Sequence, residues 1–127
     1  MATTLESVPT AVVKAVSDAA KVPAEQVPGK LLDLLGATLT AAIGGAQAAR
    51  AAREWAEGRR CNRADALKAA LQASAAISTS YGAESARSWF TSTNPDLDWT
   101  SPLVFVRAAN EPADYDRLVQ VAAQDAR

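Results

Sequence analysis

The sequence predicts an all-α protein: a compact helical domain of six or seven helices. Thirty of its 127 residues are alanine, which is the strongest helix former and a poor strand former. Leucines recur at helical spacing, as in Leu31 and Leu35 or Leu67 and Leu71, and no segment alternates as a strand would. Because large apolar side chains are scarce, we expect a core built from close helix–helix contacts.

Prolines and glycines divide the chain into helical segments. Proline is tolerated in the first turn of a helix, and glycine commonly ends one. Gly36 can divide the second segment, the pair Gly44-Gly45 separates the second segment from the third, and Gly58 ends the third. The expected helices cover residues 9–20, 29–37 or beyond, 46–57, 63–80, 83–90, 102–109 and 113–125.

Two of the later helices have capping residues. Asn62 is expected to cap the long connector helix, with Asp65 in its first turn, where a negative charge is favourable. Ser101 caps the helix that starts at the following proline. We expect an N-terminal region over residues 1–62, and a connector helix with a small C-terminal module over residues 63–127.

The composition excludes several kinds of chemistry. There is no histidine and one cysteine, Cys61, so the chain has no histidine base, no Cys–His pair and no zinc site. A Gly-rich phosphate loop of the GxxxxGK[ST] type is missing too. We therefore expect no enzyme, no catalytic residue, no metal and no cofactor. A lone cysteine, no signal peptide and no apolar run of 18 residues predict a cytoplasmic protein that does not enter a membrane.

The net charge of −1 is divided unevenly along the chain. Residues 50–68 carry six cations against three acids, whereas residues 69–127 carry four cations against seven acids. The middle of the chain is therefore basic and the C-terminal part acidic. This asymmetry predicts two different binding faces.

A segment over residues 38–58 has the pattern of a degenerate helix–turn–helix: a short apolar helix, a glycine-containing turn and a second helix. Ala52 and Trp55 are expected to be buried, which leaves the opposite side of the second helix for the major groove of DNA. The candidate DNA-binding residues are Gln47, Arg50, Arg53, Arg59, Arg60 and Arg63. A solvated surface helix is the alternative, since Glu54 and Glu57 would repel DNA.

Aromatic residues gather in the C-terminal segment over residues 83–107. Trp89 and Leu103 are expected to pack in the core. Trp99 has polar neighbours on both sides, so it is the better candidate for an exposed contact with a partner. The same segment contains a turn at Asn94 and a Ser-Pro helix start.

This segment resembles the toxin-binding domain of the Xre/MbcA/ParS family of bacterial antitoxins. Family members show an Ala-Arg pair before Trp-Phe or Trp-Leu, then a turn, a leucine and a Ser-Pro or Thr-Pro helix start. The matching residues are Ala86, Arg87, Trp89, Phe90, Asn94, Pro95, Leu97, Ser101, Pro102 and Leu103. Residues 55–58 resemble the Trp-x-x-Gly that ends the family's helix–turn–helix, and residues 63–80 resemble its connector, so the resemblance covers about residues 29–127. The family's loop often has glycine after the leucine, where this chain has Asp98 and Trp99.

The resemblance implies a cytoplasmic antitoxin that binds and blocks a RES-type toxin, an NAD-consuming enzyme similar to ADP-ribosyl transferases. Family members typically dimerise through the N-terminal part and cover the toxin's active site with the C-terminal domain. Many also repress their own operon, which implies binding to operator DNA. The alternative function is a stand-alone DNA-binding transcriptional regulator of the Xre helix–turn–helix type.

We expect the acidic C-terminal part to dock on a basic NAD-binding cleft, because a cleft that attracts a pyrophosphate has a positive wall. The final helix, from Pro112, lies near the end of the chain and is expected to reach into that cleft. The candidate partner-binding residues are Asn94, Asp98, Trp99, Asp114, Tyr115 and Arg127. A solvated helix whose charges only keep the protein soluble is the alternative.

Apolar side chains over residues 9–20 and 31–39 predict a homodimer. They exceed what a thin, alanine-rich core needs, and exposed apolar patches tend to be contact sites. The same residues could instead cover one another.

Overall fold

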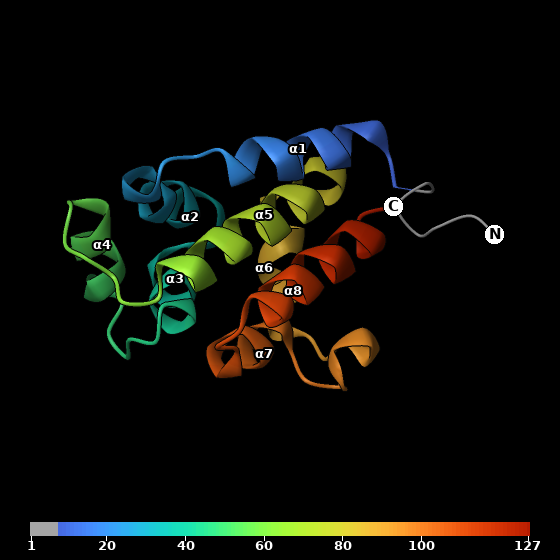
Figure 1. Ribbon diagram of the computed structural model, residues 1–127. Coiled ribbons are helices and arrows are strands. Elements are labelled where there is room, and N and C mark those ends of the chain that lie inside the picture. The colour runs from blue at the N-terminus through green and yellow to red at the C-terminus, as the bar shows by residue number, and fades with distance from the viewer. Residues whose placement is uncertain (1–7) are drawn as a thin grey trace.

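Helices form the regular structure of residues 8–127, which are the residues that the computed structural model describes (Figure 1). These residues contain eight α-helices, two short 3-10 turns and no strand, which confirms the all-α prediction. The elements are α1 (Thr10–Ala20), η2 (Ala24–Gln26), α2 (Val27–Leu35), α3 (Ala37–Ile43), α4 (Arg50–Ala56), α5 (Ala64–Tyr81), α6 (Ala83–Thr91), η3 (Pro95–Leu97), α7 (Pro102–Ala108) and α8 (Pro112–Asp125).

Glycine explains why the described residues contain eight α-helices rather than six or seven. Gly36 has a left-handed φ of +85°, which glycine adopts without strain, and it separates α2 from α3. The next helix, α4, begins at Arg50 rather than near residue 46. Turns and bends occupy residues 44–49 instead, where the N–H of Ala46 donates to the carbonyl of Ala41 (2.9 Å).

The two predicted helix caps have different outcomes at α5 and α7. Ser101 caps α7 as predicted, because its Oγ accepts a hydrogen bond from the N–H of Val104 (3.2 Å). Asn62 does not cap α5, contrary to the prediction: Arg63 occupies the N-cap position, and its side chain makes no capping hydrogen bond. The helix starts one residue later than expected, so Asn62 lies outside it and is exposed.

The longest helix, α5, lies at the centre of the molecule (Figure 1). Helices α1 and α2 from the N-terminal half and α6 and α8 from the C-terminal half pack against it. Small side chains at the contacts let helices approach closely. The buried alanines of α5 are Ala66, Ala69, Ala70, Ala73 and Ala76. The described parts of the two expected regions, residues 8–62 and 63–127, therefore share one core.

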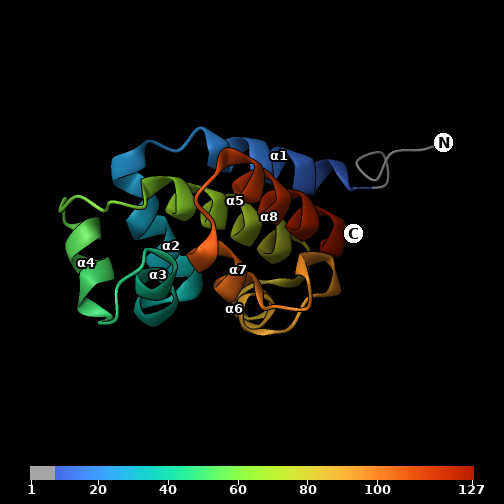
Figure 2. The same ribbon diagram turned by 60° about the horizontal axis from the view of Figure 1, so that its bottom comes forward.

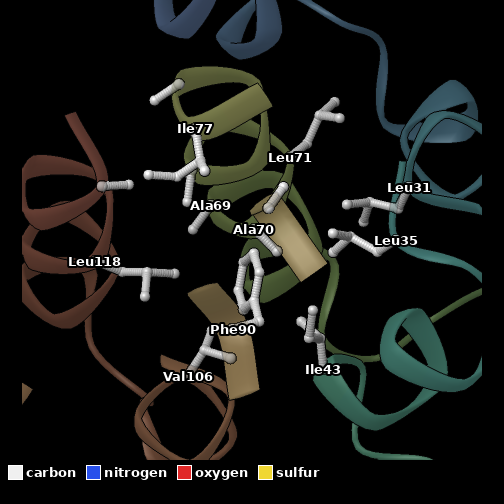
Figure 3. Close-up of a cluster of buried hydrophobic side chains, with 14 of the residues drawn as sticks. Leu31, Leu35, Ile43, Ala69, Ala70, Leu71, Ile77, Phe90, Val106 and Leu118 are labelled. Carbon is white, nitrogen blue, oxygen red and sulfur yellow. The ribbon is translucent and has the colours of Figure 1, made fainter. Parts of the chain in front are cut away.

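Larger side chains fill the space between α5 and its neighbours (Figure 3). Phe90 of α6 is fully buried and points into the middle of this cluster. Val106 and Leu118 lie on one side of its ring, and Leu35 and Ile43 lie on the other. The cluster thus joins α6, α7 and α8 to α2 and α3, so packing around Phe90 connects both halves of the chain.

Two further residues of the C-terminal segment belong to the core, as predicted. Trp89 and Leu103 are half-buried and pack against it. The Trp89 ring meets the Phe90 ring edge-to-face, with centroids 5.0 Å apart.

The start of α5 also bonds to the end of α1. Lys68 donates hydrogen bonds to the carbonyls of Ala20 and Val22. The last carbonyls of a helix have no partner within it, so a cation at this place is favourable. Lys68 is one of the six cations of residues 50–68, but its ammonium group is bonded within the chain, where it joins α1 to α5.

None of the helices within residues 8–127 combines the length and the apolar character needed to cross a membrane. The first seven residues, on which the expectation about a signal peptide rests, lie outside the described residues.

Candidate functional site

The second helix of the predicted helix–turn–helix is α4, which packs against α2 and α3 at one end of the molecule (Figures 1 and 2). Ala52 and Trp55 are buried, as predicted, and the Trp55 ring lies against Gly44 in the preceding turn. Arg50 and Arg53 are exposed and form no ion pair or side-chain hydrogen bond within the described residues. Gln47, in the turn, is also exposed.

The other predicted DNA-binding arginines differ in how free they are. Arg59 pairs with Glu54 at 2.7 Å, whereas Arg60 is exposed and has no partner in the described part of the chain. Arg63 is half-buried, and its guanidinium donates to three carbonyls at the end of α7. Its acceptors are the carbonyl oxygens of Val106 (2.7 Å), Arg107 (2.8 Å) and Ala109 (2.9 Å). We therefore remove Arg63 from the DNA-binding surface: it fastens α7 to the start of α5.

A hollow of about 720 Å³ lies between η2, the end of α4, the start of α5 and the link from α7 to α8. Its lining includes Arg59, Arg60 and Arg63, a set that suits an anionic ligand. Two of these arginines are already bonded within the chain, and Glu25 and Asp65 line the same hollow. Only Arg60 is therefore left to bind an anion, and Glu25 and Asp65 would repel it. This balance of charges argues against an anion site.

A loop over residues 92–100, called the Trp99 loop below, joins α6 to α7 and contains η3. Asn94 organises this loop. Its backbone carbonyl accepts hydrogen bonds from the N–H groups of Leu97 (3.1 Å) and Trp99 (3.0 Å), and its Oδ1 accepts one from Asp96 (2.9 Å). Because Asn94 is only 7% exposed, and its side-chain atoms bond to Asp96 of the loop and Asp125 of α8, we correct its assignment from partner contact to loop structure.

Trp99 is the most exposed large apolar residue of the described chain, at 71% of its surface. Both Trp99 (φ +63°) and the preceding Asp98 (φ +59°) have left-handed backbone. For residues other than glycine this conformation costs on the order of 1–3 kcal/mol and is found preferentially at binding and catalytic sites. Val104, in the first turn of α7, is 54% exposed.

Carboxylates lie close to this apolar surface. Asp96 and Asp98 are exposed in the loop itself. A hollow of about 220 Å³ separates the loop from the start of α8, and Asp98, Val104 and Asp114 line it. Three of the seven acids of the C-terminal part, Asp96, Asp98 and Asp114, therefore lie in or beside the Trp99 loop.

Helix α8 is part of the core rather than a free arm. Leu118, Val121 and Ala122 are buried on the side of α8 that packs against α5. Drawing the helix into the cleft of a partner would expose this apolar face to water. The final helix is therefore not free to reach into the cleft of a partner on its own, contrary to the expectation, and its docking on a partner stays a prediction.

The predicted partner-binding residues do not form one surface. Asp98, Trp99 and Asp114 lie around the Trp99 loop, whereas the hydroxyl of Tyr115 donates to the carbonyl of Ala109 (3.3 Å) beside the 720 Å³ hollow. Arg127 follows the other end of α8, about 20 Å from Asp114 at 1.5 Å rise per residue. Only the first group brings apolar and acidic side chains together.

The sequence did not indicate two residues that bond to the Trp99 loop. Arg117 and Asp125, both on α8, bond to the loop from one helix. Their spacing of eight residues places them on the same side of a helix, which the sequence does reveal, but nothing in the sequence names the loop as their partner.

The apolar faces that predicted a homodimer are largely used inside the chain. Val12, Leu31 and Leu35 are buried, and Leu32 is half-buried. Val13 remains 48% exposed. The argument for a dimer through this region therefore loses its basis, and the dimer stays a prediction.

Comparisons of the chain with family models, with curated proteins and with solved structures return no match. In both views helix α4, on which the exposed Arg50 and Arg53 lie, and the Trp99 loop are at opposite ends of the molecule (Figures 1 and 2). The structure thus has two separate candidate functional surfaces. One is the basic surface of α4, and the other is the apolar and acidic surface at the Trp99 loop.

Proposed function

We propose that the chain is an antitoxin-like protein that binds and blocks a RES-type, NAD-consuming enzyme through its Trp99 loop. The observation that carries this proposal is Trp99 itself, which is 71% exposed and has left-handed backbone. The resemblance of residues 83–107 to the toxin-binding domain of Xre/MbcA/ParS antitoxins supplies the class of partner. Such a protein acts in the cytoplasm, where its partner meets NAD.

Trp99 has the properties of an interface hot spot. Tryptophan is enriched among hot spots because a large, flat side chain buries much apolar area while few rotamers are frozen. With 71% of its surface exposed, Trp99 adds little to the core of its own chain and keeps most of its surface for a partner. Asp98 and Asp114, which line the hollow beside the loop together with Val104, supply the polar rim that surrounds most interface centres.

The charge around Trp99 fits a basic partner. A cleft that binds the pyrophosphate of NAD needs a positive wall, so exposed carboxylates favour the encounter. Asp96 and Asp98 are both exposed in the loop. We infer that the Trp99 loop, rather than the final helix, covers the NAD-binding cleft.

The experiment measures inhibition of NAD consumption by the RES-type enzyme encoded nearest to this gene, with increasing amounts of each variant of the chain. Trp99→Ala is expected to weaken inhibition by about 30-fold, the loss expected for a hot spot of about 2 kcal/mol. Val13→Ala is the matched control, because Val13 is an exposed apolar residue on α1. Equal inhibition by Trp99→Ala and the wild type would refute the proposal.

DNA binding by α4 is a second candidate function. The chain could bind operator DNA in addition to inhibiting its partner, or it could act as a stand-alone transcriptional regulator. The observation that favours it is the placement of Arg50 and Arg53 on the exposed side of a helix whose other side carries buried Ala52 and Trp55. Changing both arginines to alanine is expected to remove preference for operator sequence in a gel shift. Lys30→Ala, at an exposed cation of α2, is the control. Unchanged DNA binding by the double variant would exclude α4 as the DNA-binding element.

A further inference from the structure

We propose that Arg117 and Asp125 of α8 are positioning residues that hold the Trp99 loop in the conformation that binds its partner. The inference rests on the proposed function for the role of the loop in binding. The final helix then contributes to inhibition from behind the loop, as a support with two attachment points, rather than by entering the partner.

The first attachment point is Asp125. Its Oδ2 accepts two hydrogen bonds, from the indole Nε1–H of Trp89 (2.8 Å) and from the side-chain amide of Asn94 (2.9 Å). Trp89 belongs to α6, and Asn94 is the residue around which the loop is organised. One carboxylate oxygen thus fixes the start of the Trp99 loop to both α6 and α8.

The second attachment point is Arg117, about two helical turns before Asp125. Its Nη2 donates to the backbone carbonyl of Asp96 at 2.7 Å, and its Nη1 lies 3.5 Å from the carboxylate of Asp98. The guanidinium also stands 5.7 Å from the centre of the Phe105 ring in α7, within range of a cation–π contact. Arg117 therefore holds the middle of the loop against α7 and α8.

The loop needs such support because its backbone is strained. Asp98 and Trp99 both have left-handed φ, and strained residues persist only where their surroundings over-determine them. The Trp99 side chain is too exposed to hold the loop by its own packing. Buried Leu97 anchors the loop in the core, and the hydrogen bonds of Arg117 and Asp125 attach the loop to α8. A loop held in its bound shape before the encounter loses less entropy on binding.

The first test needs no partner. In Asp125→Ala, the exchange of the Trp89 indole proton with solvent, followed by NMR, is expected to accelerate about tenfold, the effect of losing one hydrogen bond to a charged group. In Arg117→Ala, the backbone N–H groups of residues 96–99 are expected to show faster internal motion. Asp116→Ala, at an exposed carboxylate of α8, is the control and should change neither. Unchanged exchange and unchanged loop motion in the first two variants would overturn the inference.

A swap of functional groups tests whether Asn94 and Asp125 act through their direct contact. Asn94→Asp alone sets two carboxylates against each other, so it should disorder the loop. Adding Asp125→Asn restores a donor and an acceptor at the same place and should return most of the loop's order. A general loss of folding would not be rescued in this way, so a double variant as disordered as Asn94→Asp contradicts a direct role.

The second test adds the RES-type enzyme used above. Asp125→Ala and Arg117→Ala should each raise the dissociation rate about tenfold and leave the association rate nearly unchanged, because the contact surface is intact but less ordered. If Trp99→Ala weakens binding while both α8 variants bind as the wild type does, the inference is overturned and the proposed function stands. If Trp99→Ala binds normally, the proposed function is overturned, and the NMR experiment alone decides whether α8 holds the loop.

Discussion

Replacing Gly44 by alanine tests how tightly α4 is packed against the turn that precedes it. Gly44 has an ordinary φ of −76°, so alanine meets no backbone strain there. The obstacle is the ring of Trp55: a Cβ at this position would lie 2.5 Å from Cζ3 and closer still to Cη2. Carbon atoms in contact normally lie about 3.5–4.0 Å apart, so the ring or the turn must move by about 1 Å.

The size of the effect follows from the burial of Trp55. Its side chain is only 8% exposed, so it has little room in which to retreat, and overpacking of a core costs typically about 1–3 kcal/mol. The clash is with ring atoms rather than with a flexible chain end, so we expect the upper part of this range, about 2–3 kcal/mol. For a chain of this length that corresponds to a fall in Tm of about 10 °C.

The assay is thermal and urea unfolding followed by circular dichroism, with Gly29→Ala as the matched control. Gly29 lies in α2 with no atom within 4 Å of the added Cβ, so alanine should stabilise the helix by about 0.5–1 kcal/mol. Trp55→Leu should cost less in the Gly44→Ala background than in the wild type, because the clash is then relieved. If Gly44→Ala is as stable as Gly29→Ala, the Trp55 ring does not occupy the space beside Gly44 and the reasoning is refuted.

Three further predictions follow from single contacts. Arg63→Ala should lower the free energy of unfolding by about 2 kcal/mol in urea, because the end carbonyls of α7 lose a charged donor, whereas Arg60→Ala should change it by less than about 0.5 kcal/mol. Deletion of residues 111–127 should abolish cooperative unfolding, because it removes the buried face of α8; a folded product would contradict the described core. The hydrogen bond from Lys14 to Asp18 (2.7 Å) lowers the pKa of Asp18 below its ordinary 3.8, so its stabilising contribution is present above about pH 4 and lost as the pH falls through the folded-state pKa. Asp18→Asn should therefore be less stable than the wild type near pH 6 and equal to it near pH 2, and an equal difference at both pH values would exclude the ion pair as its cause.

The helical order of the chain could be predicted because helix formation depends on neighbours in the sequence. Alanine content, the leucine spacing of α5 and the Ser101 cap of α7 are local signals, and each is confirmed. The burial of Ala52 and Trp55 on one side of α4 follows from the same periodicity. Asn62 shows the limit of such signals: a good capping residue lies one position away from the cap that forms.

Only the part of the candidate site that depends on neighbours in the sequence could be predicted. Polar neighbours in the sequence were enough to indicate that Trp99 is exposed. They did not indicate that Asn94 is buried, or that its amide bonds to Asp125, which lies 31 residues further along the chain. Nor did they show that Arg63 is held by the carbonyl of Val106, 43 residues away.

The sequence by itself determined that the chain is helical, where most helices begin and end, and which way the faces of α4 and α5 point. The tertiary structure alone decided how each charged residue is placed: which cations stay exposed, and which bond to the carbonyls at the ends of other helices. The reason is physical. Periodicity and capping act over three or four residues, whereas the partner of a long charged side chain depends on which distant helix end the packing brings beside it. Arg50 and Arg63 look alike in the sequence, yet one is exposed on α4 and the other fastens α7 to α5.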